Sequence, residues 1–120
     1  MTKINGKFDL EERTGKFGEN IIIFAKSLSK NEITKPLIHQ VIRSATSIGA
    51  NYMEANGASS KKDFKNKIHL CQKESKETQH WLRMIAVAEP QSKEESKKLW
   101  KECQEFVLIF GKIISTMREK

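Results

Sequence analysis

The sequence predicts an all-α protein, folded as an antiparallel, up-down-up-down four-helix bundle. Four segments carry apolar residues at steps of three and four, the spacing that places side chains on one face of an α-helix. No segment shows the period-two alternation of a half-buried strand. The connections between these long helices are short, which favours antiparallel neighbours, and 120 residues suit one domain spanning residues 1–120.

The first two helices are expected over residues 9–28 and 35–56. The apolar face of the first consists of Leu10, Thr14, Phe17, Ile21, Phe24, Ala25 and Leu28. The face of the second consists of Ile38, Val41, Ile42, Ala45, Ile48, Gly49, Tyr52 and Met53. We expect Thr34 to be the N-cap of the second helix, with Pro36 in its first turn, and Gly57 to end it in a left-handed conformation.

The third and fourth helices are expected over residues 60–89 and 92–118, with Pro90 between them. Ser60 with Asp63, and Ser92 with Glu95, have the spacing of a capping box at each start. The third helix has a heptad-like seam of Phe64, Ile68, Cys71, Ser75, Thr78, Leu82 and Ile85. The fourth has Leu99, Cys103, Phe106, Phe110, Ile113 and Met117, with Trp100, Val107 and Ile114 widening that face.

Composition indicates a soluble protein, with 31% charged and 38% apolar residues. The longest apolar runs, residues 21–24 and 106–110, fall far short of the roughly 20 residues that a membrane span needs. The N-terminal segment has no apolar signal core, so we expect a cytoplasmic protein with no membrane association. Cys71 and Cys103 lie on the apolar seams, and we expect both to be reduced core residues.

The motifs of catalysis are missing from the sequence. Di-metal centres in four-helix bundles need two Glu-x-x-His motifs, and there is one match, at residues 77–80. Helical periodicity turns His80 of that match away from the core. No spacing ties a nucleophile to a base, and the glycines form no phosphate-binding loop. We therefore expect no enzymatic activity, no metal and no cofactor.

Two polar or mixed stripes lie outside the apolar seams. On the third helix, Leu70, Glu74, Glu77, Trp81 and Ala88 lie beside the seam, which favours burial against another subunit; the alternative is a wide edge of the core. On the second helix, Arg43, Ser47, Asn51 and Glu54 lie opposite the apolar face. Ser47 and Asn51 are four residues apart and close enough to touch.

The net charge of +7 allows binding to nucleic acid or to another acidic surface. Only four of the 22 basic residues are arginines, so the charge suits phosphate attraction better than base readout. The candidate lysines are Lys61, Lys62, Lys65, Lys67, Lys73 and Lys76 on the third helix and Lys93, Lys97, Lys98 and Lys101 on the fourth. The alternative is a solvated surface that only keeps the protein soluble.

Residues 41–82 carry a recognisable series of motifs. They begin with Arg43, Ser47, Ile48, Asn51 and Glu54, continue with Ser60, Lys61 or Lys62 and Phe64, and end with Glu74, Ser75, Glu77 and Thr78. This series resembles the four helix bundle protein family, also called the 23S rRNA-intervening-sequence protein family. The N-terminal segment departs from the family pattern, having "FDLEERTGKFGENII" where members have a "DLxVW"-like start.

The resemblance implies an up-down bundle that assembles as a homo-oligomer, usually a ring of five, and implies no catalytic residues. Genes of this family are often inserted in large-subunit ribosomal RNA genes. The family is similar to the accessory subunit of diversity-generating retroelements, a basic pentameric barrel that binds nucleic acid and a reverse transcriptase. That similarity is one of fold.

These observations favour a non-enzymatic, homo-oligomeric bundle that binds RNA or DNA through its lysines. The alternative is a protein–protein adaptor that binds no nucleic acid. We also expect Arg43, Asn51, Glu54, Glu74 and Glu77 to form hydrogen-bonded pairs across or near subunit contacts, where such groups specify register.

Overall fold

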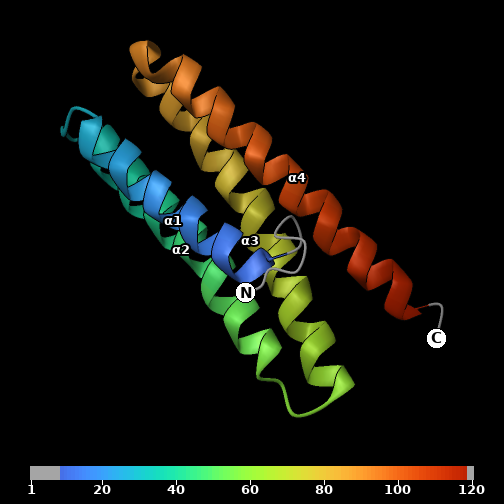
Figure 1. Ribbon diagram of the computed structural model, residues 1–120. Coiled ribbons are helices and arrows are strands. Elements are labelled where there is room, and N and C mark those ends of the chain that lie inside the picture. The colour runs from blue at the N-terminus through green and yellow to red at the C-terminus, as the bar shows by residue number, and fades with distance from the viewer. Residues whose placement is uncertain (1–8, 119–120) are drawn as a thin grey trace.

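The computed structural model describes residues 9–118 and contains four long helices in that range. They are α1 (Leu10–Ser27), α2 (Thr34–Asn56), α3 (Lys61–Ala88) and α4 (Lys93–Arg118), with a short 3₁₀ turn η2 (Pro90–Ser92) before α4. Consecutive helices run in opposite directions (Figure 1). The predicted all-α, up-down bundle is thus confirmed, with helix ends within about two residues of those expected.

The two connections at one end of the bundle lie close together. Figure 1 shows the α1–α2 loop beside the α3–α4 turn, with the α2–α3 loop at the opposite end. The Glu89 side chain is buried there, and its Oε1 accepts a hydrogen bond from the backbone N–H of Ser29 at 2.9 Å. A carboxylate of the α3–α4 turn therefore holds the α1–α2 loop in place.

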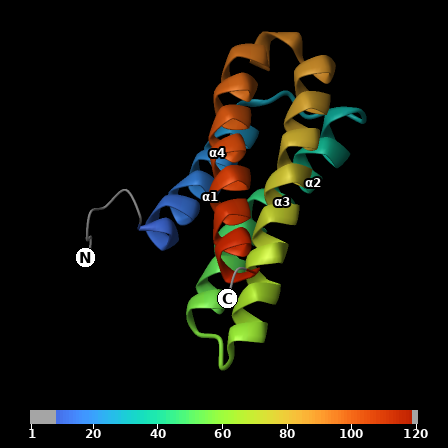
Figure 2. The ribbon, with the colours of Figure 1, turned by 90° about the vertical axis from the view of Figure 1, so that its right-hand side faces the viewer.

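Neighbouring helices of the bundle do not all pack equally closely. α1 packs along α2, α2 along α3 and α3 along α4, whereas contact between α1 and α4 is sparse within the described residues. Figure 2 shows α1 running obliquely to α4. Arg13 of α1 links the two helices. Its Nε and Nη2 donate to Glu102 of α4 at 2.9 and 3.0 Å, and it also pairs with Glu105. Its guanidinium lies 5.1 Å from the centre of the Phe106 ring. The hydrogen bond with Glu102 is the largest of the causes that raise the pKa of Arg13.

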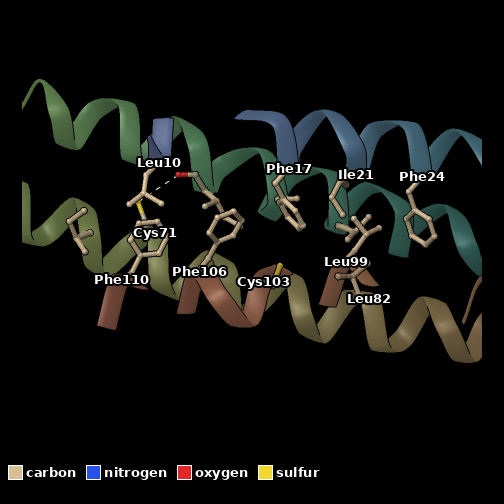
Figure 3. Close-up of a cluster of buried hydrophobic side chains, with 14 of the residues drawn as sticks. Leu10, Phe17, Ile21, Phe24, Cys71, Leu82, Leu99, Cys103, Phe106 and Phe110 are labelled. Carbon is tan, nitrogen blue, oxygen red and sulfur yellow. Dashed lines mark hydrogen bonds between the residues drawn. The ribbon is translucent and has the colours of Figure 1, made fainter. Parts of the chain in front are cut away.

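The core is built largely from the predicted seams. All seven residues expected on the first helix are buried, as are Ile68, Cys71, Ser75, Thr78, Leu82 and Ile85 of α3. Phe17, Ile21 and Phe24 point from α1 toward α3 and α4 (Figure 3). The dashed line in the same view is the bond from the Cys71 thiol to the carbonyl of Ile48, with a sulfur–oxygen distance of 3.6 Å. Cys71 and Cys103 are free and buried, as predicted.

Two residues assigned to apolar faces are instead exposed. Met53 is 56% exposed and Trp100 is 39% exposed, so neither lies in the core. Ser44 and Ala55 of α2 are buried although the sequence pattern did not select them. The inward face of α2 is therefore rotated toward its small residues, because α2 packs between α1 and α3 and must approach both closely.

The start of α2 differs from the prediction that Thr34 caps it. Thr34 is the first helical residue, and the capping side chain is Asn31, whose Oδ1 accepts from the backbone N–H groups of Ile33 and Thr34, both at 2.9 Å. Thr34 Oγ1 in turn accepts from the N–H of Asn31 at 3.0 Å. The two residues form a reciprocal pair with the three-residue spacing of a capping box.

Two other predicted helix ends are wrong and one is confirmed. Gly57 has φ −99° and ψ 12°, so α2 ends without a left-handed residue. Ser92 does not cap α4, since it lies in η2 and its hydroxyl donates to the carbonyl of Glu89 at 2.7 Å. Ser60 does cap α3, accepting from the N–H of Asp63 at 3.0 Å.

Candidate functional site

A polar seam joins α2 to α3 and contains most of the predicted oligomer residues. The Arg43 guanidinium donates to Glu74, with an Nη1–Oε1 distance of 3.4 Å, and pairs with Glu77. Glu77 Oε2 also accepts from the indole N–H of Trp81 at 3.1 Å. We call Arg43, Glu74, Glu77 and Trp81 the Arg43 cluster. It is half-buried, and the Glu74 side chain is only 14% exposed.

The remaining residues of the predicted polar set continue the seam toward the α2–α3 loop. Asn51 Nδ2 donates at 2.9 Å to the backbone carbonyl of Ser47, rather than to the Ser47 side chain that their spacing had brought into consideration. Glu54 forms an ion pair with Lys67 at 2.8 Å. Lys67 is one of the candidate nucleic-acid lysines, and its charge is therefore already paired. Each of these pairs forms within one chain, and whether the seam also lies near a subunit contact stays a prediction. Leu70 is an apolar side chain left 37% exposed beside it.

The candidate lysines occupy exposed positions on α3 and α4. Exposed side chains are Lys61, Lys62, Lys73, Lys76, Lys93, Lys97, Lys98 and Lys101, and Lys65 is half-buried. Gln79 Nε2 donates to Gln104 Oε1 at 2.9 Å, and Gln72 Nε2 donates to the carbonyl of Val107 at 3.1 Å, so these glutamines mark the outer α3–α4 seam. At about 100° per residue, Lys65, Lys76 and Arg83 lie on the same face of α3 as these glutamines. Basic side chains therefore flank this seam.

A hollow of about 320 Å³ lies on this seam, near the η2 end of α4. We call it the tryptophan groove, and it is lined by Leu82, Arg83 and Ala86 of α3 and by Lys93, Ser96, Lys97, Trp100 and Lys101 of α4. Among these described lining residues, four are basic and none is acidic. The groove combines apolar side chains from both helices with a positive rim.

The tryptophan groove includes residues that sequence reasoning missed as a site. Arg83 was not selected, and Trp100 was assigned to the core. The sequence contains a pattern that could have indicated this site. Lys93, Lys97 and Lys101 are four residues apart, and helical periodicity places Trp100 on the same side of the helix. Lys98 does not line this groove; it lines a hollow of about 690 Å³ between α1 and α4.

The hollow between α1 and α4 has a different electrostatic character. Its lining mixes Asp9, Glu12, Glu95 and Glu102 with Arg13, Lys16 and Lys98. Arg13 is already engaged by Glu102 and Glu105. Since its charges are mixed and partly paired, this hollow is less suited to an anion than the tryptophan groove.

The two cysteines and the single Glu-x-x-His match have surroundings that bear on the predicted absence of catalytic and metal chemistry. Burial raises the pKa of Cys71 to about 12 and raises that of Cys103, so both remain protonated thiols at neutral pH. Glu77 of the Glu-x-x-His match pairs with Arg43, while His80 is exposed with its ring centre 4.8 Å from that of Trp81. Within residues 9–118, no three His, Cys, Asp or Glu residues gather where a metal ion could be held. In the same range, no helix is both long and apolar enough to cross a membrane.

Comparisons with known proteins agree with this architecture. The family model described as 23S rRNA-intervening sequence protein matches residues 7–112. A crystal structure of a protein of unknown function from the S23 ribosomal protein family of Bacteroides thetaiotaomicron is 31% identical in sequence, with a TM-score of 0.79. The similarity covers 87% of this chain and 96% of that one. None of the curated proteins matches the chain. The extent of the match to the family model shows that this chain belongs to the 23S rRNA-intervening sequence protein family.

Proposed function

We propose that this protein is a non-catalytic scaffold that binds nucleic acid through the basic outer face of α3 and α4 and assembles as a homo-oligomer. The observation that carries the proposal is the tryptophan groove, where Arg83, Lys93, Lys97 and Lys101 converge with no acidic residue among the described lining residues. The net charge of +7 favours the same class of partner.

Self-association would strengthen a weak surface of this kind. Linked sites on one assembly act at a high effective concentration, so several modest lysine patches bind one long strand more tightly than each binds alone. Leu70 supports such assembly as an exposed apolar side chain next to the Arg43 cluster. The family resemblance makes five the expected number of subunits.

Nucleic-acid binding is tested by titrating labelled single- and double-stranded RNA and DNA across a salt series. We expect binding that weakens steeply with salt, because each neutralised phosphate releases counterions. Replacing Lys97 and Lys101 with Gln should weaken binding and flatten the salt dependence. The matched control is Lys26→Gln with Lys35→Gln, which removes the same charge from exposed positions on α1 and α2. Equal loss in both double variants would show that only net charge matters, and no binding at low salt would refute the proposal.

The assembly is tested on α3 by sedimentation equilibrium. We expect Leu70→Glu to reduce the assembly mass, because it introduces a charge at the proposed contact. Val87→Glu is the control, since Val87 is 75% exposed and lies about 100° away around the helix. An unchanged mass for Leu70→Glu and for Trp81→Glu would contradict a subunit contact on this face.

A protein adaptor is the second candidate, favoured by a different surface. A hollow of about 360 Å³ between α1 and α2 is lined in part by Gly15, Gly18, Gly49 and Ala50, beside the exposed side chains of Ile22 and Met53. An apolar surface of this kind suits a partner protein. Failure of all four nucleic acids to bind at low salt, with the assembly intact, would favour this function.

A further inference from the structure

We propose that the tryptophan groove receives one unpaired base of a single-stranded nucleic acid, stacked on Trp100, with the neighbouring phosphates held by Arg83, Lys93, Lys97 and Lys101. The inference rests on the proposed function and goes further, because it specifies a single-stranded nucleic acid and a base stacked on Trp100. It predicts that the protein distinguishes single strands from duplexes without reading a particular sequence.

Trp100 provides a surface on which a base can stack. A tryptophan that is 39% exposed on a monomer surface leaves a large apolar ring facing water, and this one lies between Lys97 and Lys101 in a groove that also contains Leu82 and Ala86. Bases stack on exposed aromatic rings because both present flat π faces, and the stack tolerates any base. The aromatic ring thus supplies what the lysines lack, a surface for the base itself.

The lysines of the groove are regularly spaced along α4. Lys93, Lys97 and Lys101 follow each other at four-residue intervals, so successive Cα atoms are about 6 Å apart along the axis of α4. That interval is close to the separation of successive phosphates in a nucleic-acid backbone. Arg83 faces them from α3 across the groove. A strand lying along α4 would therefore meet a lysine at each phosphate while a base reaches Trp100.

The size of the groove favours a single strand over a duplex. The groove has a volume of about 320 Å³, which is at the small end for a ligand site and is too small for a duplex to enter. In a duplex the bases are paired and stacked inside, so none can reach the indole without being flipped out at a cost. A duplex would contact the lysine rim alone, with weaker binding as the consequence.

Tryptophan fluorescence reports this contact directly. The protein contains two tryptophans, so a Trp81→Phe background leaves Trp100 as the single tryptophan emitter. We expect a short single-stranded oligoadenylate to quench Trp100 saturably, and a duplex of the same length to quench it less. In the wild-type background, Trp100→Leu should weaken single-strand affinity about 5- to 150-fold, the range expected for loss of one stacked base. Trp100→Phe keeps an aromatic ring and should lose less.

The salt dependence separates this inference from the proposed function. Trp100→Leu removes stacking but no charge, so its binding should weaken with an unchanged salt slope. Lys97→Gln with Lys101→Gln should reduce the slope by about 1.4, since each single-strand phosphate contact contributes about 0.7. Thermal unfolding monitored by circular dichroism verifies that each variant is folded before it is compared.

Three results would overturn the inference in distinguishable ways. If Trp100→Leu and Trp100→Phe bind single strands as wild type does while the lysine variant is weakened, nucleic-acid binding stands and the stacking site is refuted. If no nucleic acid binds at low salt, the proposed function fails as well. If an acidic peptide quenches Trp100 and the oligoadenylate does not, the groove is a protein-binding site.

Discussion

Ser44 Oγ and Thr78 Oγ1 lie 2.8 Å apart between α2 and α3, and both side chains are completely buried. Thr78 Oγ1 also lies 2.8 Å from the carbonyl of Glu74, to which it donates, so the Ser44 hydroxyl is the donor toward Thr78. The alternative acceptor for Ser44, the carbonyl of Val41, is more distant at 3.5 Å. A hydroxyl pair in an apolar interface thus fixes the register of two helices, because neither group has water as an alternative partner.

This arrangement makes the two hydroxyls unequal. Ser44→Ala leaves Thr78 still donating to Glu74 and should cost about 1 kcal/mol of unfolding free energy. Thr78→Val keeps the shape but leaves the Ser44 hydroxyl with a poor acceptor, so we expect a larger loss, about 2 kcal/mol. The double variant should recover part of that loss. Urea unfolding measures all three, and a smaller effect for Thr78→Val than for Ser44→Ala would contradict the assigned donor direction.

The Arg43 cluster should contribute more to stability than the other ion pair of the seam. Arg43→Ala leaves Glu74 and Glu77 close together without their cation, and we expect a loss of about 1–2 kcal/mol, moderated by the partial exposure of the cluster. Arg43→Lys should rescue only part of it, because an ammonium group cannot bridge both carboxylates in the same way. Lys67→Ala, which removes a pair with the 53% exposed Glu54, is the control and should have little effect. Chemical denaturation of the three variants, all at one protein concentration, tests the order.

Two glycines of the α1–α2 contact should respond oppositely to alanine. A Cβ at Gly15 would meet no atom within 4 Å, so Gly15→Ala should stabilise the protein by about 0.5–1 kcal/mol through helix propensity. A Cβ at Gly49 would lie 3.3 Å from Thr14 Oγ1 and 3.4 Å from the Thr14 carbonyl carbon. Thr14 Oγ1 is held by the carbonyl of Leu10 at 2.7 Å and cannot turn away freely, so Gly49→Ala should destabilise. The melting temperatures of the two variants test this prediction. If both variants were equally stabilised, α1 would have to shift easily on α2 to make room for the new Cβ at Gly49, and the prediction would be wrong.

The buried thiols should make the protein sensitive to alkali. The ordinary thiol pKa is 9.0, and that of Cys71 in the folded protein is raised to about 12, with Cys103 shifted in the same direction. Between these values the unfolded chain releases thiol protons that the folded chain keeps, so stability is fully present below about pH 9 and falls as the pH rises toward 12. Tyr52, whose pKa burial also raises, adds to the same trend.

The measurement is the unfolding free energy as a function of pH for wild type and for the Cys71→Ala, Cys103→Ala double variant. The variant is less stable overall because it lacks core volume, but its stability should fall less steeply above pH 9. Parallel curves would exclude the thiols as the cause. At neutral pH, both thiols of the wild type should react with a chromogenic disulfide only as fast as the protein opens.

The periodic pattern of apolar residues determined most of this fold. Leu10 to Leu28 and Ile68 to Ile85 are buried where their spacing of three and four predicted, because a helix with one apolar stripe must turn it toward a core. Ser60 capped α3 as its spacing indicated, since its partner Asp63 lies within the same turn. Helix caps and apolar stripes depend on residues close together in the chain, so they can be predicted from the sequence alone.

The tertiary structure decided what depends on the neighbour that a face meets. The sequence analysis grouped Arg43 with Glu74 and Glu77 as hydrogen-bonded pairs across or near subunit contacts. The packing of α2 on α3 brings these two partners to Arg43 within one chain, from more than 30 residues away. Periodicity assigned Trp100 to the core, whereas the packing of α4 on α3 leaves the ring at the edge of a groove with Arg83. The sequence by itself determined most of the residues that α1 and α3 bury, because periodicity is a property of one helix. Which charged and aromatic side chains share a surface was decided by the packing of α3 against α4, because it requires the relative placement of two helices.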